Sequence, residues 1–458
     1  MSVARAAGGG FAALALALYL WPQAIGLAPG LAPTAALVLF ALGFWATGAL
    51  PFHLTSLLLF VLATALEIAP PRVIFAGFAS SALWLVFGGL VIGAAVQTTG
   101  LGRRLARLLV GHLGGSYRRI IYGTVAMGVG LAFLIPAAMG RIMIMVPIFA
   151  ALATELGLGR GSRGRSGILL AVSFGTILPA FAILPANLPN MVLLGVSETL
   201  YDVRLTYAAW LLLHFPVLGL LYALLLAELI CRLFPDRPRE RAAATEALPP
   251  WSLAERRLLA ILVLALALWA TDSLHGVSPG WVALGAAVAC MVPGVGVLDV
   301  RSFETVTSFG VFFYIAGLLG MVSLIDASGL AAMLAETAGR WLPVAPDAPA
   351  RNFGVMVLAA SLMGLVTAHP GVPAVLGPLA GPLAEASGLP LVSVLMTQIV
   401  GFSATLLPYV SAPLMVAIQL TNVGLGAATR LSLMLGSLTL VLLVPLAYLW
   451  WRWLGYLS

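Results

Sequence analysis

The chain has 458 residues, of which 62% are hydrophobic and only 9% are charged. A water-soluble protein carries about a quarter of its residues as charged groups, so most of this surface must face something other than water. Continuous apolar runs of about twenty residues predict helical membrane spans and exclude a β-barrel, whose strands alternate apolar and polar residues over about ten positions. The net charge of +7 does not indicate nucleic acid, because the basic residues, all of them arginine, lie between the predicted spans.

Hydropathy predicts an all-α polytopic membrane protein with about eleven spans. In chain order these spans lie near 9–27, 34–50, 52–69, 81–100, 167–195, 205–233, 257–273, 279–297, 305–327, 391–421 and 427–453. Two further apolar stretches, 120–157 and 351–388, are interrupted by Pro or Gly near their middles. Because proline ends or kinks a helix, each stretch predicts a re-entrant hairpin, two half-length helices joined at a non-helical tip. The predicted tips hold Ala137, Ala138 and Met139 in the first hairpin, and Ala368 and Pro370 in the second.

The arginines predict the orientation of the chain. With a cytoplasmic N-terminus, seventeen of the 23 fall in predicted cytoplasmic segments and five on the opposite side. Cytoplasmic loops carry an excess of basic residues, so we expect a multi-pass protein of the bacterial inner membrane with this orientation. Residues 234–256, rich in Pro and charge, are predicted to form a cytoplasmic linker.

The regions on either side of this linker resemble each other. Trp45-Ala46-Thr47 recurs as Trp269-Ala270-Thr271, and a later tripeptide pair keeps nearly the same spacing. We therefore predict an N-terminal span at 1–33, a first repeat at 34–233 and a second repeat at 257–458. Five spans in each repeat would place the two repeats upside down relative to each other, as in secondary transporters. A duplicated scaffold without a transport path is the alternative.

Several motifs resemble the divalent-anion/sodium symporter family, part of the wider ion transporter superfamily. They are Phe75–Ser80, Gly88-Gly89 and Ser403–Pro413, and the resemblance extends from about Ala35 to Leu454. It implies an elevator-type transporter, commonly a homodimer, in which hairpin tips and unwound spans bind sodium and a carboxylate or sulfate.

The same resemblance exposes two departures from the family pattern. That family's hairpin tips usually carry Ser-Asn-Thr, whereas here they read Ala137-Ala138-Met139 and Ala368-His369-Pro370. A sodium site near the tips therefore stays an open expectation. The coupling ion is expected to be Na⁺ or H⁺, and no other cofactor is predicted.

Polar residues near the tips and helix breaks are the candidate substrate-binding groups. They are Arg141, Asn187, Asn190, His369, Thr405, Tyr409 and Ser411, and the breaks are predicted at Pro185, Pro189, Pro408 and Pro413. Half-helix N-termini at such breaks favour anions, although polar residues in membrane helices can also simply bond neighbouring helices.

Arg141 follows the first tip and has no acidic neighbour in the sequence. A guanidinium in the membrane interior is costly unless it is paired or hydrated. We predict that it faces a cavity and binds an anion bidentately, in place of the charge that a bound sodium supplies. Snorkelling to an interface or pairing with a distant carboxylate such as Glu155 is the alternative. His369 is a candidate proton-coupling group, or alternatively an ordinary satisfied polar residue.

These features predict a secondary active transporter of a small anion, a carboxylate, a sulfate-like ion or a sulfonate, working by alternating access. No catalytic or metal-binding motif indicates an enzyme. The expected partners are the anionic substrate, the lipid bilayer and a second copy of the chain. The alternatives are a cation/proton antiporter or oxyanion exporter of the same superfamily, or an anion channel, which would conduct without counterflow.

Overall fold

The computed structural model describes residues 2–111, 113, 116–239, 249–299, 301, 303–304, 309–339 and 342–457. Within these ranges every regular element is helical. The longer α-helices are α1 (Ser2–Leu20), α2 (Ala32–Thr47), α3 (Phe52–Ala65), α5 (Ser81–Thr99), α6 (Leu101–Gly111), α7 (Tyr117–Leu134), α8 (Ala138–Glu155), α9 (Arg163–Ile177), α10 (Leu188–Tyr201), α11 (Tyr207–His214), α12 (Tyr222–Leu233), α13 (Leu253–Ala270), α15 (Pro279–Met291), α17 (Phe309–Ala327), α18 (Leu330–Gly339), α19 (Pro349–Leu376), α20 (Ala380–Ser387), α21 (Leu391–Ser403), α22 (Ala412–Thr421), α23 (Leu425–Leu438) and α24 (Val444–Trp453).

Shorter segments join these helices. They are the α-helical turns α4 (Pro71–Ile74) and α14 (Asp272–His275), the 3-10 turns η1 (Pro22–Ile25), η2 (Ala76–Ala79), η3 (Pro179–Ala182), η4 (Leu184–Ala186) and η6 (Pro408–Val410), and the π-helical segments η5 (Phe215–Leu221) and η7 (Thr439–Leu443). The π segments continue their neighbours, so α11 to α12 and α23 to α24 each form one long rod, as the predicted spans 205–233 and 427–453 require.

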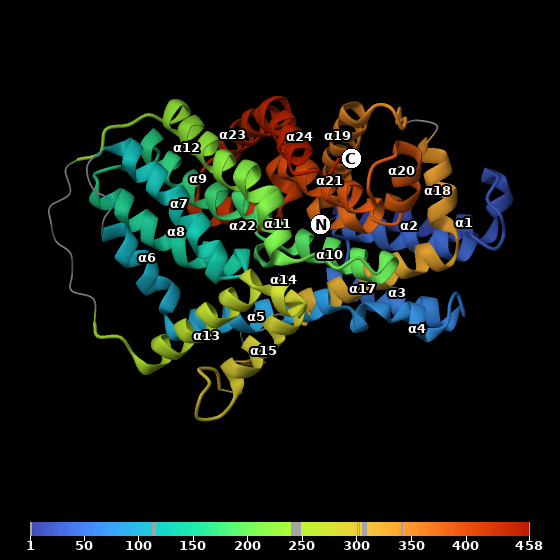
Figure 1. Cartoon of the computed structure of the whole chain (residues 1–458), viewed down its shortest axis with the longest axis horizontal. Coiled ribbons are helices and arrows are strands. Elements are labelled where there is room, and N and C mark those ends of the chain that lie inside the picture. The colour runs from blue at the N-terminus through green and yellow to red at the C-terminus, as the bar shows by residue number, and fades with distance from the viewer. Residues whose placement is uncertain are drawn as a thin grey trace.

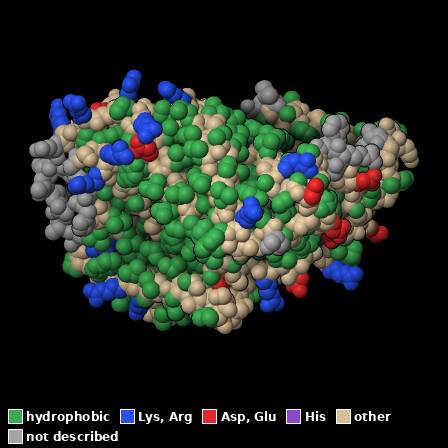
Figure 2. Space-filling view, turned by 45° about the horizontal axis from the view of Figure 1, so that its top comes forward, with side chains coloured by type: hydrophobic (Ala, Val, Ile, Leu, Met, Phe, Trp, Pro, Cys, Tyr) green, Lys and Arg blue, Asp and Glu red, His purple; other side chains and the backbone are tan. Residues whose placement is uncertain are grey.

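The prediction of an all-helical protein with many apolar spans is confirmed. Among the described residues, seven helices are long and apolar enough to cross a membrane, or eight if the bent pair of α20 and α21 counts as one span. Several other predicted spans are shorter helices; α3, for example, has 14 residues. Figure 2 shows hydrophobic side chains over most of the middle of one face, with charged side chains mainly toward its edges and ends.

Two predicted segments fall partly outside this description. Residues 240–248 of the predicted linker and residues 305–308 at the start of one predicted span lie outside the described residues. Two separate helices, α6 and α18, follow α5 and α17.

The first predicted hairpin is interrupted where its proline predicts. Helix α7 ends at Leu134, and Ile135 and Ala137 are extended on either side of Pro136. Ala138 and Met139, predicted as part of the tip, instead form the first turn of α8. The helix can restart at once because the first N–H groups of a helix need no intrahelical partner.

The second predicted hairpin reverses at Ala368, whose backbone is non-helical at φ 59° and ψ 170° inside α19. A Cβ built on Gly364 would lie 3.6 Å from Cγ2 of Val372, eight residues later. Residues eight apart in a straight helix are about 12 Å apart along its axis, so the chain must fold back between them.

Two helical rods are interrupted as predicted. After α9 the chain makes two 3-10 turns and an extended residue, Asn187, before α10 begins. After α21 it is irregular up to the single 3-10 turn η6, and α22 follows. Pro185 lies within the first break and Pro408 begins η6, whereas Pro189 and Pro413 sit in the first turns of α10 and α22. Proline is tolerated there because its missing N–H would have no partner anyway.

The interrupted regions of the two halves lie side by side. Helix α22 from the C-terminal half packs against α8 and α9, and α10 packs along α19. Figure 1 shows α22 among the α7 to α9 group, and α13 and α15 along the opposite edge beside α5. This arrangement brings the first break close to the second hairpin.

Candidate functional site

Arg141 is fully buried, and its guanidinium is held by main-chain carbonyls. Nη1 donates to the carbonyl of Ile135 at 2.6 Å, and Nη2 donates to that of Thr176 at 3.0 Å. Both terminal nitrogens also reach the carbonyl of Ala186, at 3.2 Å each. These oxygens belong to the first tip, to the last turn of α9 and to the end of η4. We call this group of three carbonyls the carbonyl cage.

The cage explains how a cation can be buried here. Carbonyls near helix ends lack intrahelical partners, and the C-terminal end of a helix carries a partial negative charge. Among the described residues no carboxylate forms an ion pair with Arg141. The side chain therefore neither snorkels to an interface nor pairs with Glu155 in this conformation. Within the part of the chain that the structure describes, its positive charge has no carboxylate in ion-pair contact.

One donor of Arg141 is left over. Nε is buried and has no hydrogen-bond partner among the residues that the structure describes. A bidentate grip on an anion through the two terminal nitrogens would require them to leave the carbonyl cage. In this conformation, Arg141 can therefore act on an anion through its field or through Nε.

Asn187 and Asn190 hold the rest of the first break together. Asn187 Nδ2 donates to the carbonyl of Ile177 at 2.9 Å. Asn190 Nδ2 donates to the carbonyls of Phe181 and Ile183, both at 3.0 Å, while its buried Oδ1 accepts from no described residue. Both amides thus satisfy carbonyls that an unbroken helix would have used itself, and Asn190 keeps one free acceptor.

At the second tip, the side chain of His369 faces the second break. Nε2 of His369 lies 3.3 Å from Oγ1 of Thr405. The imidazole packs against two aromatic rings that also contact each other, with its centroid 5.2 Å from that of Phe181 and 6.0 Å from that of Phe402. Because Phe181 belongs to the first break, residues from both halves meet at His369.

Tyr409 and Ser411 differ in exposure. Tyr409 is 53% exposed, and its hydroxyl donates to the carbonyl of Leu365 at 2.8 Å, which links the second break to the second hairpin. Ser411 is buried, as are the remaining five candidate side chains, including Thr405. The structure therefore gathers Arg141, Asn187 and Asn190 at the first break, and the other four at the second. An anion would reach most of them only after a rearrangement.

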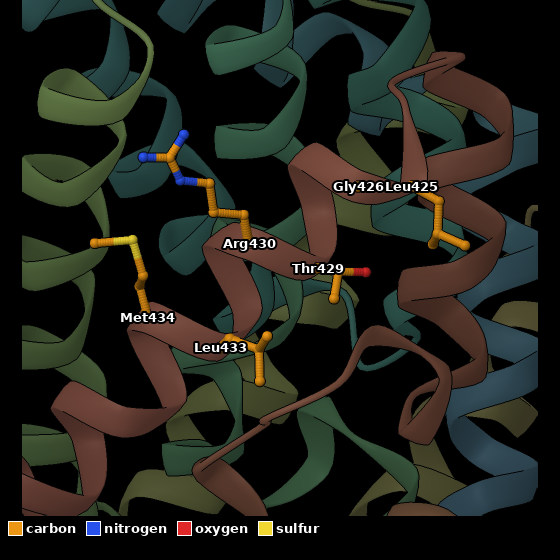
Figure 3. A pocket seen from close by; sticks show the side chains of 6 residues that line it. All are labelled: Leu425, Gly426, Thr429, Arg430, Leu433 and Met434. Carbon is orange, nitrogen blue, oxygen red and sulfur yellow. The ribbon is translucent and has the colours of Figure 1, made fainter.

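A hollow of about 650 Å³ lies along α23 and involves none of the candidate residues. It is lined by Leu425, Gly426, Thr429, Arg430, Leu433 and Met434. Figure 3 shows Arg430 and Met434 extending to one side of the helix and Leu425 to the other. The hollow is mostly apolar and open, which suits contact with lipid better than an enclosed anion site.

Comparison with known proteins decides the family. The model of the sodium:sulfate symporter transmembrane region matches residues 11–457. The chain belongs to the sodium:sulfate symporter family. This membership confirms the family resemblance that Phe75–Ser80, Gly88-Gly89 and Ser403–Pro413 indicate.

Relatives of this sodium:sulfate symporter family member span most of its length. A membrane protein of Cupriavidus necator is 27% identical, over 97% of this chain and 92% of its own. The L-tartrate/succinate antiporter of Escherichia coli is 24% identical, over 82% of this chain and 79% of its own.

Two solved structures share the fold. The YdaH transporter of Alcanivorax borkumensis superposes with a TM-score of 0.56 at 16% identity, covering 93% of this chain and 99% of its own. MtrF of Neisseria gonorrhoeae also has a TM-score of 0.56, at 15% identity and 82% coverage of each chain. At these identities, the likeness extends to the fold alone.

The main groups that sequence reasoning missed in this family member are backbone carbonyls. Those of Thr176, Ala186 and Phe181 bond candidate side chains, and the indole of Trp210 also donates to Phe181 at 3.3 Å. Carbonyls carry no residue-type signal. The only hint was the run of prolines at 179, 185 and 189, which indicates that backbone groups are released there.

Proposed function

We propose that the protein is a secondary active transporter of a small anion across the bacterial inner membrane. The observation that carries the proposal is the buried guanidinium of Arg141, which lies where a tip and a helix break meet and pairs with no carboxylate of the described ranges. An uncompensated cation in a low-dielectric setting attracts an anion more strongly than one in water. Membership of the sodium:sulfate symporter family supports the same conclusion.

In this proposal the two repeats are inverted and work by alternating access. The breaks at Pro136 and Ala368 would be the tips of re-entrant hairpins that enter from opposite sides, the first from the cytoplasm. The excess of arginine in the predicted cytoplasmic loops supports a cytoplasmic N-terminus. A homodimer would hold the static helices in place while the helices around the breaks move.

Carboxylates are the first substrate class to test, followed by sulfate-like ions and sulfonates. A relative that is 24% identical over most of its length is named an L-tartrate/succinate antiporter, which supports small carboxylates. Asn190 Oδ1 is an unpaired acceptor, so a substrate carrying a hydroxyl beside its carboxylate would find both an attractive charge and an acceptor at the first break.

For coupling, we propose that Arg141 supplies the charge that a bound sodium ion would supply. Carbonyl oxygens are good ligands for small hard cations, and here the guanidinium occupies the place where three of them converge. Anion exchange without a sodium gradient is therefore expected. His369 would then be the candidate for proton coupling, and His369→Gln should remove any pH dependence of transport near neutrality. An unchanged pH profile in that variant would exclude this role.

Proteoliposome uptake tests the proposal. Vesicles loaded with succinate, tartrate, sulfate or a sulfonate are given the same labelled anion outside, with and without sodium. Saturable uptake that is stimulated by internal anion and unaffected by sodium is expected. Steady conductance without stimulation by internal anion would indicate a channel instead. Anion-independent proton flux would indicate a cation/proton antiporter, and strict sodium dependence would contradict the proposed role of Arg141.

A further inference from the structure

The helices form two groups that pack tightly within themselves. In the group that we call the frame (α2, α3, α5, α13, α15 and α17), a Cβ on Gly88 would lie 2.6 Å from the backbone of Ala283. A Cβ on Gly280 would likewise collide with the carbonyl of Ser81. The other group, the core (α7 to α12 and α19 to α24), contains both tips and both breaks.

The boundary between frame and core is lined by small residues. A Cβ on Gly93 of α5 would lie 3.2 Å from Cβ of Ala137 at the first tip, and one on Gly89 would lie 3.7 Å from Pro136. On the core side, a Cβ on Gly195 of α10 would lie 3.1 Å from Cβ of Ala82 of α5 and 2.7 Å from Cδ2 of Leu319, whose side chain packs onto this glycine from α17. The small residues let the first tip and α10 approach α5 closely, and the side chain of Leu319 interdigitates across the boundary at Gly195.

A carboxylate of the core also reaches across this boundary. Glu198 of α10 accepts hydrogen bonds from Ser81 at 2.5 Å, from Ser80 at 3.3 Å and from Ser278 at 3.4 Å. The hydroxyls of Ser81 and Ser278 also lie 2.6 Å apart. We call this group, formed by Glu198, Ser80, Ser81 and Ser278, the serine latch.

The latch is built at the starts of two frame helices. Ser80 is the N-cap of α5 and accepts from the amide of Ala82, and Ser278 is the N-cap of α15 and accepts from that of Gly280. The N-terminal ends of both helices carry partial positive charge, so each favours a carboxylate. Hydrogen bonds to an ionised acceptor are also stronger than neutral ones. Glu198 is therefore held by charge as well as by geometry.

A second carboxylate, that of Asp272, also links the core to the frame, close in the chain to Ser278. Asp272, in the turn before α15, accepts from the amide of Tyr207 at the start of α11, and from that of Ala208 at 3.5 Å. The chain runs from Glu198 to Tyr207 on the core side and from Asp272 to Ser278 on the frame side. The polar fastening is thus concentrated at one end of the boundary.

We infer that the serine latch holds the core against the frame in one end state of the transport cycle and opens when the core moves. This inference rests on the proposed function, because alternating access requires the core to move relative to the frame. Movement of α10 along α5 would carry Glu198 away from all three hydroxyls together. The latch would therefore act as a switch that sets the population of this state.

Bridging experiments test the latch. In a background with Cys231 and Cys290 replaced by serine, Ser81→Cys with Glu198→Cys is bridged by a short bifunctional thiol reagent. This links frame to core and should abolish anion exchange, with recovery when a cleavable bridge is reduced. Ser81→Cys with Ser278→Cys is the matched control, because both residues belong to the frame; bridging it should leave anion exchange at the level of the same variant before bridging. Exchange that survives the first bridge, or is abolished equally by both, would overturn the inference.

Hydrogen exchange gives a readout that does not depend on transport. Glu198→Gln keeps the side-chain length but removes the charge. The amides at 80–84 and 195–199 should exchange about fivefold faster, the effect of losing one net hydrogen bond, while those around Ala283 stay unchanged. Unaltered exchange at 80–84 would refute the latch even in a protein that transports well. If the wild type takes up no anion but the hydrogen exchange of Glu198→Gln changes as expected, the result counts against the proposed function and not against the latch.

Discussion

Both terminal nitrogens of Arg141 donate to one main-chain oxygen, the carbonyl of Ala186, over 3.2 Å each. Arg141 lies four residues after Ala137 at the first tip. Ala186 is the last residue of η4, two residues before α10 begins. A single side chain therefore ties the first tip to the first break. Whatever moves the tip must either carry the break with it or release the guanidinium.

Replacing Arg141 should harm stability and transport together. Arg141→Ala leaves three buried carbonyl oxygens without a donor, at about 1–3 kcal/mol for each unsatisfied group. We expect a clearly lower melting temperature and at least a tenfold fall in anion exchange, about the effect of 1.4 kcal/mol. Arg141→Lys keeps the charge but not the planar fork, and should lose less of both. Thermal unfolding and proteoliposome exchange measure the two effects.

Adding a free cation to Arg141→Ala distinguishes loss of the positive charge from loss of the folded structure around it. Guanidinium or sodium ions should restore part of the exchange in Arg141→Ala by entering the carbonyl cage, and should not stimulate the wild type. Arg430→Ala is the matched control, because Arg430 is an exposed arginine on α23 and its loss should change little. Full activity of Arg141→Ala without any added cation would disprove the electrostatic role.

Adjacent glycines on α5 make a sharp test of the packing. A Cβ on Gly88 would lie 2.6 Å from backbone atoms of Ala283, which cannot move aside, whereas one on Gly89 would meet Pro136 at an ordinary 3.7 Å. Gly88→Ala should therefore destabilise the protein by about 1–3 kcal/mol through overpacking. Gly89→Ala gains the same helix propensity without the clash and should be neutral or slightly stabilising. Chemical or thermal unfolding of the two variants decides the matter, and equal stabilities would contradict the close packing of α5 and α15.

The breaks were predictable from sequence because proline acts locally. Pro136 and the residues around Pro370 mark where α7 and α19 are interrupted, since a ring without an N–H disrupts the helix wherever it falls. The polar residues beside them could also be named, because few polar residues occur in such apolar stretches. The family resemblance then supplied the overall architecture.

The partners of these residues were not predictable. Arg141 bonds only backbone oxygens, which no residue type reveals, and its neighbours Thr176 and Ala186 lie 35 and 45 residues away. Glu198 reaches Ser81 across 117 residues and Ser278 across 80. Contacts of this kind follow from how the helices pack, and a single sequence carries no record of pairing. The exact start of α8 also escaped prediction, since helix ends vary by a residue or two.

The ion pair between Arg104 and Glu255 predicts a loss of stability in acid. Arg104 Nε donates to Glu255 at 2.6 Å, and this hydrogen bond lowers the pKa of the Glu255 carboxyl below its ordinary value. Glu255 lies in the first turn of α13, within the predicted linker and outside the predicted span. Because the folded-state pKa is depressed, the stabilisation is fully present above the unfolded-state pKa and disappears as pH falls through the folded-state value.

Glu255→Gln isolates this contribution. The wild type should melt several degrees higher than the variant at pH 7, and the difference should shrink progressively as pH is lowered below about 4.5, the range in which a free Glu carboxyl titrates. Arg104 also donates to the carbonyls of Pro249 and Pro250, so Arg104→Ala should cost more than Glu255→Gln. A difference in melting temperature that stays constant from pH 7 to pH 3 would show that the charge of Glu255 is unimportant.

Ala368 should be improved by glycine. Its φ of 59° and ψ of 170° lie in a region that is essentially restricted to glycine, and an alanine held there costs about 1–3 kcal/mol. Ala368→Gly removes the Cβ that causes the strain, at the expense of a more flexible unfolded chain, so we expect a net stabilisation of about 1 kcal/mol. Ala368→Val should be destabilising, because a β-branched side chain tolerates positive φ even less well. Unfolding experiments on both variants measure the difference.

A glycine substitution at a helical position of α19 shows whether the stabilisation by Ala368→Gly comes from the non-helical backbone at residue 368. Ala360 lies in the same helix α19, away from the non-helical residue, and glycine there should cost about 1 kcal/mol because it is a poor helix former. Opposite signs for Ala368→Gly and Ala360→Gly are therefore expected. If both substitutions destabilise the protein equally, residue 368 is not strained, and the second tip must reverse direction by a different backbone route. A stable Ala368→Gly variant that transports more slowly would instead mean that the strain at the tip helps to drive its movement.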